Sequence, residues 1–253
     1  MSKDFHVVIP ARYGSARLPG KPLIDIAGVP MVLRVADNAT QSGAQSVVVA
    51  TDDVRVIDVC RAAGVDALLT SADHQSGSDR VYEVVTRKNW AGNEVVVNVQ
   101  GDEPLLHSGV IRRVGLALHE DESVNVCTLR DPIENAADLQ DENIVKVLTD
   151  RFDRALYFSR AAIPHTRLDN RYDRAADQGN YGWRHVGIYA FRVKQLADFV
   201  GLPHSVLETQ EMLEQLRLLE DGVAIKVLAS KESVPGGVDT PEDLERVRSQ
   251  FSR

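Results

Sequence analysis

The sequence has little cysteine and no long apolar run. Its 253 residues include two cysteines, Cys60 and Cys127, whose spacing suits neither a zinc site nor an evident disulfide. We therefore expect buried thiols in a reducing compartment. No stretch of 18 apolar residues occurs, and the first residues, Met-Ser-Lys-Asp-Phe-His, contain no apolar signal region. These absences predict a soluble, cytoplasmic protein without stable membrane association.

An excess of positive charge is missing as well. The net charge of −8 argues against broad binding to nucleic acid or anionic membranes. A hydrophobic content of 43% and a charged content of 26% are ordinary for a globular protein. Because no repeat, low-complexity linker or composition boundary interrupts the chain, we expect one domain over residues 1–253.

Two common nucleotide-binding motifs are also absent. No Gly-x-Gly-x-x-Gly follows the first predicted strand, which disfavours a nicotinamide-dependent oxidoreductase. A P-loop is approached but not formed, because five residues separate Gly14 from Gly20 where that motif needs four. Pro22 also replaces the Ser or Thr that would ligate Mg²⁺. An ordinary kinase or ATPase is therefore disfavoured.

What the sequence has instead is a cationic loop after its first strand. Residues 5–9 form a β-rich run that Pro10 bounds, and a helical pattern opens at Pro30. The cations of the intervening, glycine- and proline-rich loop are Arg12, Arg17 and Lys21. Three cations on such a loop at the end of a strand predict a polyphosphate site, with a solvated basic loop as the alternative.

Short apolar strands then alternate with helices. Further strands are expected at 45–50, 66–70 and 94–99, and helices at 54–62 and 78–88. This alternation predicts a doubly wound α/β fold with a mostly parallel sheet, in which ligands bind beyond the carboxyl ends of the strands. The polar loops that would meet at that edge are 12–22, 51–53, 71–80 and 100–104.

The second half of the chain is less regular. Strands are expected at 124–129, 145–149, 155–158, 186–192 and 224–228. The spacing of Met212, Leu213, Leu216 and Leu219 predicts one helix over 209–219. The polar tract 165–182 is interpreted as a surface loop, with a mobile flap over a substrate as the alternative.

Two aspartates in glycine- and proline-rich turns are the candidate metal ligands. Asp102 lies in Gly-Asp-Glu-Pro after a strand, and Asp239 lies in Gly-Gly-Val-Asp-Thr-Pro. Mg²⁺ is commonly held by one or two carboxylates together with phosphate oxygens, so we expect this pair to hold it. A helix N-cap is the alternative role for Asp239. Asp52 and Asp53 are expected to cap the helix that follows them.

Other polar residues permit two interpretations. The first case is His-Gln-Ser-Gly-Ser-Asp-Arg (74–80). In the functional interpretation, this loop contacts a nucleotide and Arg80 binds a carboxylate bidentately. In the structural interpretation, Ser76 or Ser78 is only the N-cap of a helix. A later set, which by spacing alone is more often structural, comprises His185, Tyr189, Glu208, Glu211, Glu214 and Gln215.

Eight blocks in order resemble the 3-deoxy-manno-octulosonate cytidylyltransferase family, also called CMP-KDO synthetases. The first is Ile-Pro-Ala-Arg-Tyr-Gly-Ser-Ala-Arg-Leu-Pro-Gly-Lys-Pro-Leu (9–23), and the others are 50–53, 74–80, 97–104, 158–164, 185–192, 211–217 and 237–244. Related cytidylyltransferases share the first block but not the full set. One departure is Ser78, where the family often has Thr.

The resemblance implies a Rossmann-like nucleotide-diphospho-sugar transferase fold with an elaborated second half, and a cytoplasmic homodimer. It implies transfer of CMP from CTP to the anomeric hydroxyl of KDO for lipopolysaccharide biosynthesis. The implied nucleotide-binding residues are Pro10, Ala11, Arg12, Arg17, Lys21, His74 and Ser76. The implied sugar-acid residues are Arg80, Gln100, His185, Tyr189, Glu214 and Gln215. The implied catalytic set is Arg12, Arg17 and Lys21 with the Mg²⁺ ligands Asp102 and Asp239.

Two alternatives stay open beside this resemblance. One is a cytidylyltransferase for another acidic sugar, such as a sialic acid. The other is a nucleotide-binding regulator without catalysis. Residue chemistry alone does not distinguish cytosine from uracil, and it fixes neither the number of Mg²⁺ ions nor the dimer geometry.

Overall fold

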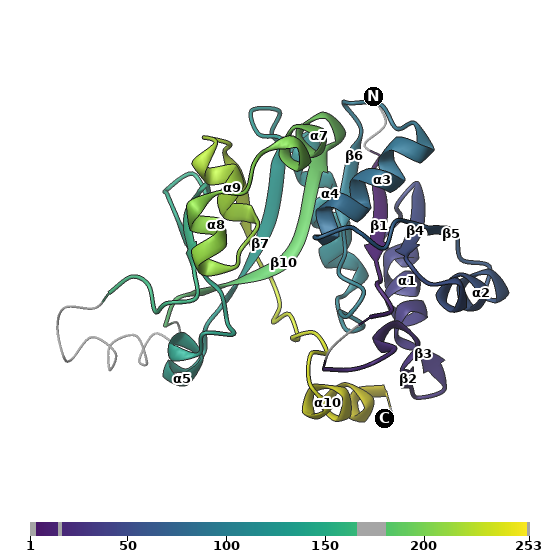
Figure 1. The fold of residues 1–253 in the computed structure, drawn as a ribbon. Helices are drawn as coiled ribbons and strands as arrows, with labels where there is room; N and C mark the ends of the chain where they lie inside the picture. The colour runs from purple at the N-terminus through teal and green to yellow at the C-terminus, as the bar shows by residue number, and fades with distance from the viewer. Residues whose placement is uncertain (1–3, 15–16, 166–180, 252–253) are drawn as a thin grey trace.

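Strands from both halves of the chain join in one large sheet. The computed structural model describes residues 4–14, 17–165 and 181–251. Its strands are β1 (His6–Pro10), β2 (Asp25–Ile26), β3 (Val29–Pro30), β4 (Ser46–Thr51), β5 (Ala67–Leu69), β6 (Val95–Asn98), β7 (Val126–Pro132), β8 (Lys146–Thr149), β9 (Ala155–Ser159), β10 (Trp183–Arg192) and β11 (Ile225–Ala229). The order along the main sheet is β11-β7-β10-β6-β1-β4-β5, and β2 and β3 form a separate pair (Figure 1).

Helices lie on both faces of this sheet. They are α1 (Met31–Gln41), α2 (Val54–Ala62), α3 (Gly77–Lys88), α4 (Ser108–Glu120), α5 (Ala136–Gln140), α7 (Val193–Gly201), α8 (Val206–Glu211), α9 (Gln215–Glu220) and α10 (Pro241–Phe251), with a 3-10 turn, η1, at Lys21–Leu23. Val7 and Ile9 of β1 pack in one core with α1 and α4, whereas Val8 packs in a second core with α3 and α7. Burial on both faces explains why β1 is almost entirely apolar.

The first half has the parallel arrangement that its sequence predicts. β1 pairs in parallel with β4 and β6, and β4 pairs in parallel with β5. The carboxyl ends of these four strands therefore lie at one edge of the sheet. The predicted fold class, α/β with a mostly parallel sheet, is confirmed.

The second half departs from the parallel pattern at β10. This long strand runs antiparallel to both β6 and β7, with an irregularity between Val186 and Tyr189. The hairpin of β8 and β9 attaches to it where Arg184 faces Lys146. α10 contacts the β2–β3 pair, so that the last described helix lies beside residues from the start of the chain (Figure 1).

The single helix predicted over 209–219 is wrong. Two short helices, α8 and α9, occupy this region, and Met212 between them has a left-handed backbone with φ of 53°. The break lets neighbouring acids turn in different directions: Glu211 accepts a hydrogen bond from Ser159 and Glu214 accepts one from Ser78. Most of the predicted loop or flap at 165–182 lies outside the described residues.

Candidate functional site

A cavity of about 540 Å³ lies at the carboxyl edge of the parallel strands. Its walls come from the loops after β1, β5 and β6 and from the segment before α10. The lining residues are Pro10, Ala11, Arg12, Arg17, Lys21, Pro22, His74, Gln75, Ser76, Gly77, Arg80, Gln100, Gly101, Asp102 and Asp239. Eleven of these are site residues predicted from the sequence, so the structure brings most of that set together.

Lys21 joins the two predicted metal ligands. Its ammonium nitrogen lies 2.6 Å from Oδ2 of Asp102 and 3.0 Å from Oδ1 of Asp239. The same Oδ1 accepts a hydrogen bond of 3.3 Å from Arg17. The Lys21 side chain is only 13% exposed, whereas the Asp102 and Asp239 side chains are 34% and 56% exposed. Carboxylates from distant parts of the chain therefore meet opposite the cationic loop.

Close backbone approaches produce this convergence. The amide of Val238 donates to the carbonyl oxygen of Asp102 at 2.9 Å. A Cβ at Gly237 would lie 3.0 Å from that oxygen, and one at Gly101 would lie 2.8 Å from the Pro10 carbonyl oxygen. Glycine is needed at Gly101 in particular, because the close atom belongs to the backbone and cannot turn away.

The N-cap alternative for Asp239 is wrong. Thr240 fills that position, because its hydroxyl accepts a hydrogen bond of 3.2 Å from the Asp243 amide. The Asp243 carboxylate in turn accepts from the amides of Asp239 and Thr240. The side chain of Asp239 is thus available to Arg17 and Lys21.

The Asp102 and Asp239 carboxylates fit a hard divalent cation. They already share one positive group, the Lys21 ammonium, and oxygen is the ligand that Mg²⁺ prefers. Among the described residues, no group of three or more His, Cys, Asp or Glu side chains is arranged to hold a metal. A two-carboxylate site is still compatible with Mg²⁺, which keeps several ligands for water and substrate phosphate.

Glu103 is a candidate site residue that the sequence interpretation missed. Burial, together with the neighbouring Asp102 charge, raises its pKa to about 8 against the opposing effect of Arg184. Its Oε2 is buried and has no hydrogen-bond partner in the described part of the chain. The one available signal was its place directly after Asp102 in the Gly-Asp-Glu-Pro turn.

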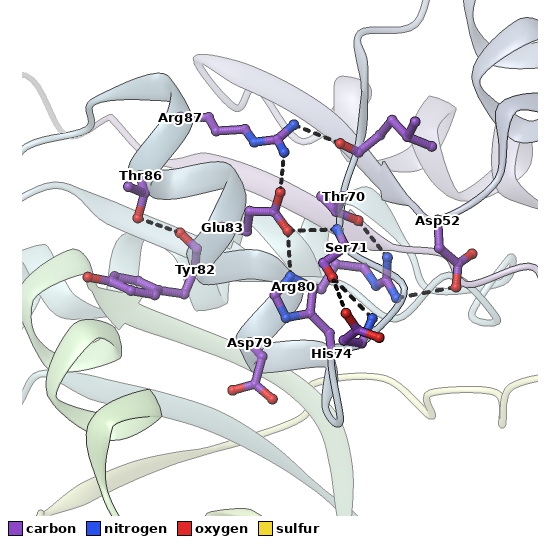
Figure 2. Close-up of polar contacts among 12 residues, drawn as sticks. Asp52, Thr70, Ser71, His74, Asp79, Arg80, Tyr82, Glu83, Thr86 and Arg87 are labelled. Carbon is purple, nitrogen blue, oxygen red and sulfur yellow. Dashed lines mark hydrogen bonds and ion pairs between the residues drawn. The ribbon is translucent and has the colours of Figure 1, made fainter.

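Side chains of α3 hold the loop that precedes this helix. Ser76 is the N-cap of α3 and forms a reciprocal capping box with Asp79, so the capping interpretation of this serine is confirmed. Arg80, 3% exposed, donates to the Thr70 hydroxyl at 2.5 Å and lies 3.4 Å from Asp52 Oδ2 (Figure 2). The carboxylate beside Arg80 in this structure therefore belongs to Asp52.

The two aspartates after β4 differ in role. Asp53 caps α2 by accepting from the Arg55 amide, as predicted. For Asp52 the capping prediction is wrong, because its Oδ1 accepts from the Tyr13 amide at 2.9 Å. Asp52, directly after β4, thereby connects the cationic loop to Arg80.

The remaining predicted sugar-acid residues lie away from the cavity wall. Of that set, Arg80 and Gln100 line the cavity, whereas four others, buried or half-buried, form a polar cluster outside its lining. Those four are His185, Tyr189, Glu214 and Gln215. The cluster is joined to α3 by the hydrogen bond of 2.7 Å from the Ser78 hydroxyl to Glu214.

Burial controls the charge of this cluster. It lowers the pKa of His185 to about 3, with a further contribution from Arg184, and it raises the pKa of Glu214. The His185 and Tyr189 rings lie 5.3 Å apart. The Tyr189 hydroxyl faces Thr128 without a hydrogen bond of normal geometry, and Gln215 Nε2 has no partner among the described residues. Such unsatisfied buried groups could be satisfied by a polar ligand.

Comparison with known proteins assigns the family. The sequence profile of a family described as cytidylyltransferase matches residues 6–227. A 3-deoxy-manno-octulosonate cytidylyltransferase of Pseudomonas syringae pv. tomato is 52% identical over 250 residues, 98% of each chain. The chain belongs to the 3-deoxy-manno-octulosonate cytidylyltransferase family. A family relative from Alcanivorax borkumensis is 49% identical, also over 98% of each chain.

A solved structure from this family supports the same conclusion. It is described as CMP:2-keto-3-deoxy-manno-octonic acid synthetase complexed with CTP, and it matches with a TM-score of 0.88 at 40% identity over 98% of each chain. The resemblance inferred from the eight sequence blocks is thus confirmed. Within the described residues, no helix combines the length and apolar character that crossing a membrane requires.

Proposed function

We propose that this protein transfers CMP from CTP to the anomeric hydroxyl of KDO and releases diphosphate. The observation that carries the proposal is the meeting of Asp102, Asp239 and Lys21 at the wall of a cationic cavity. The family assignment adds a named reaction to this geometry, since relatives about half identical are 3-deoxy-manno-octulosonate cytidylyltransferases.

The cationic loop would bind the triphosphate. Arg12, Arg17 and Lys21 line one wall of the cavity and carry three positive charges. Arginine forks match phosphate oxygens bidentately, and the lysine ammonium acts as a point charge. In a transfer from CTP, negative charge develops on the departing diphosphate, so these residues would stabilise the transition state as well as the bound substrate.

The two aspartates would hold Mg²⁺. When bound, this ion would neutralise phosphate charge and make the sugar hydroxyl more acidic. Asp102 and Asp239 supply the carboxylates, and Lys21 occupies the position of their counter-charge in the present structure. Lys21 would then be available to a phosphate oxygen.

The sugar acid would bind on the α3 side of the cavity. Arg80 and Gln100 line this part of the wall, beside Gly77 at the start of α3. Behind it lie the unsatisfied Tyr189 and Gln215 groups, which match a ligand rich in hydroxyls. Because binding energy placed here orients the attacking hydroxyl, the protein would contribute mainly by positioning.

The deciding experiment is a coupled diphosphate assay with purified protein. CTP, UTP, ATP and GTP are each supplied with KDO, with a sialic acid, or with no acceptor. The proposal expects diphosphate release and CMP-KDO formation with CTP and KDO. Release with the sialic acid alone would assign a different acidic sugar, and CTP binding without turnover would indicate a regulator.

We also propose a homodimer, which works in a reducing compartment such as the cytoplasm. Support for a second copy comes from β9, which pairs only with β8 in the described chain and exposes Leu156 by 61%. Phe152 nearby is 65% exposed. Cys60 and Cys127 are buried free thiols, compatible with reducing conditions. Light scattering after size-exclusion chromatography would test the dimer, and Leu156→Lys should weaken it.

A further inference from the structure

One face of α3 holds the loop that ends at Ser76. Arg80, Glu83 and Arg87 recur at helical spacing and all point to this loop (Figure 2). Arg87 donates to the Leu69 carbonyl oxygen at 2.7 Å, and Glu83 accepts from the Ser71 amide at 2.9 Å. The backbone of the loop is therefore fixed independently of the side chain of His74.

The Glu83 carboxylate also binds His74. Its Oε2 lies 2.5 Å from His74 Nε2, and its Oε1 lies 2.5 Å from a guanidinium nitrogen of Arg87 (Figure 2). Burial alone would raise the pKa of Glu83, but the hydrogen bonds from Ser71 and His74 and the Arg87 charge bring it below its ordinary value. The carboxylate is therefore ionised at neutral pH and can only accept hydrogen bonds.

This contact determines which nitrogen of His74 carries the proton. Because the ionised Glu83 has no proton to donate, Nε2 of His74 must be the N–H donor. In the neutral ring, Nδ1 is then a hydrogen-bond acceptor. No described residue hydrogen-bonds to Nδ1, and His74 lines the cavity. The ring thus has one nitrogen held by the protein and one available to a ligand.

We propose that Glu83 is a positioning residue that fixes the ring and tautomer of His74, so that Nδ1 accepts a hydrogen bond from the nucleotide. The donor on the nucleotide is an exocyclic amine of the base or a ribose hydroxyl. This inference rests on the proposed binding of a nucleoside triphosphate in the cavity. It gives the site a means of selecting nucleotides that does not depend on phosphate charge.

The first test measures the tautomer directly, without substrate. Long-range ¹H–¹⁵N correlation spectra of the imidazoles are recorded for the wild type, Glu83→Met and the assignment variant His74→Ala. Met is similar in size to Glu but has no oxygen that accepts from Nε2–H, so we expect the Nε2–H tautomer of His74 in the wild type and a loss of that preference in Glu83→Met. An unchanged tautomer in Glu83→Met would overturn the proposal.

The second test asks whether Glu83 acts through His74. Losing one hydrogen bond to the nucleotide should raise KM for CTP about 10-fold in Glu83→Met and in His74→Ala, with KM for KDO unchanged. The double variant should be no worse than His74→Ala alone. Arg87→Ala is the matched control, because it removes another partner of Glu83 but leaves the His74 contact. If Glu83→Met raised KM for CTP as much in the His74→Ala background as in the wild type, or if Arg87→Ala raised it as much, the role of Glu83 would be purely structural.

The nucleotide donor is identified by comparing CTP, UTP and 2′-deoxy-CTP. If the base amine is the donor, His74→Ala should reduce the preference for CTP over UTP about 10-fold. If the ribose hydroxyl is the donor, the preference for CTP over 2′-deoxy-CTP should fall instead. Neither preference changing would overturn the contact with Nδ1. Absence of CMP-KDO formation by the wild type would refute the proposed function, whereas the tautomer would still report on Glu83 and His74.

Discussion

The ammonium nitrogen of Lys21 lies 3.0 Å from a carboxylate oxygen of Asp239, although the two are 218 positions apart in the sequence. Lys21 lies in the cationic loop after the first strand, at the start of η1, and Asp239 precedes the last described helix. The contact therefore connects distant segments of the chain at the cavity. It also places the Lys21 ammonium between the Asp102 and Asp239 carboxylates, which would otherwise repel each other.

Replacing Asp102 by Asn should reduce CMP transfer by about 100-fold, as expected for the loss of one group that supports transition-state charge. Asn keeps the shape but removes the charge that would hold Mg²⁺. Diphosphate release measured over a range of Mg²⁺ concentrations checks this. The control is Asp66→Asn, whose exposed carboxylate pairs with Lys88 away from the cavity. Near-normal turnover of Asp102→Asn at saturating Mg²⁺ would refute the metal role.

Replacing Lys21 by Met should destabilise the metal-free protein by about 1–3 kcal/mol, because Asp102 and Asp239 lose their shared partner. Mg²⁺ should then raise the melting temperature more in the variant than in the wild type, since it supplies the missing charge. Thermal unfolding with increasing Mg²⁺ measures both effects. Lys231→Met, at an exposed lysine, is the control. An equal or smaller Mg²⁺ effect in Lys21→Met would contradict this account.

Replacing Glu103 by Gln should stabilise the metal-free protein increasingly as the pH rises. Burial raises the folded pKa to about 8 from the ordinary value of 4.5, so the folded state retains a proton that the unfolded state has released. Stability contributed by this carboxyl is therefore lost between pH 4.5 and about 8. Gln mimics the protonated form and avoids the loss.

Urea unfolding at pH 5.5 and pH 7.5 with a chelator measures this effect. The advantage of Glu103→Gln should grow by up to about 3 kcal/mol between these values, at 1.4 kcal/mol for each pH unit. Glu232→Gln, at an exposed position, should show no such trend. A pH-independent difference between Glu103→Gln and the wild type would show that this carboxyl does not titrate as described.

Replacing Arg217 by Met should lower the free energy of unfolding by about 3–5 kcal/mol, because it leaves the buried Glu208 carboxylate without its bidentate arginine partner. The pair is bidentate, at 2.9 and 2.7 Å, and both residues are less than 10% exposed. Adding Glu208→Gln should recover much of the loss, since Gln is also accepted in the capping box at the start of α8. Urea unfolding of both variants decides this, and a double variant as unstable as Arg217→Met would contradict it.

The strands could be predicted because burial leaves a local signature. Residues 45–50 and 94–99 each contain three consecutive valines, and β4 and β6 occupy nearly the same positions. The single helix predicted over 209–219 was wrong because long-range contacts leave no local signature. Its apolar spacing is helical, but Glu211 and Glu214 bind Ser159 and Ser78 on different elements, and one straight helix is replaced by two. Nothing near Met212 in the sequence records those partners.

The amino-acid sequence by itself determined which chemical groups are available, namely cations after the first strand and aspartates in two tight turns. It also determined the parallel strands, whose following loops all lie at one edge of the sheet. Only the tertiary structure decided what each group touches. It placed Arg80 beside Asp52 and made Thr240, rather than Asp239, the N-cap of the last helix. It also buried the Glu103 carboxyl and placed Glu83 within hydrogen-bond distance of His74. The physical reason is that periodicity and turn chemistry act over a few residues, whereas charge, protonation and hydrogen bonding depend on neighbours that folding brings from anywhere in the chain.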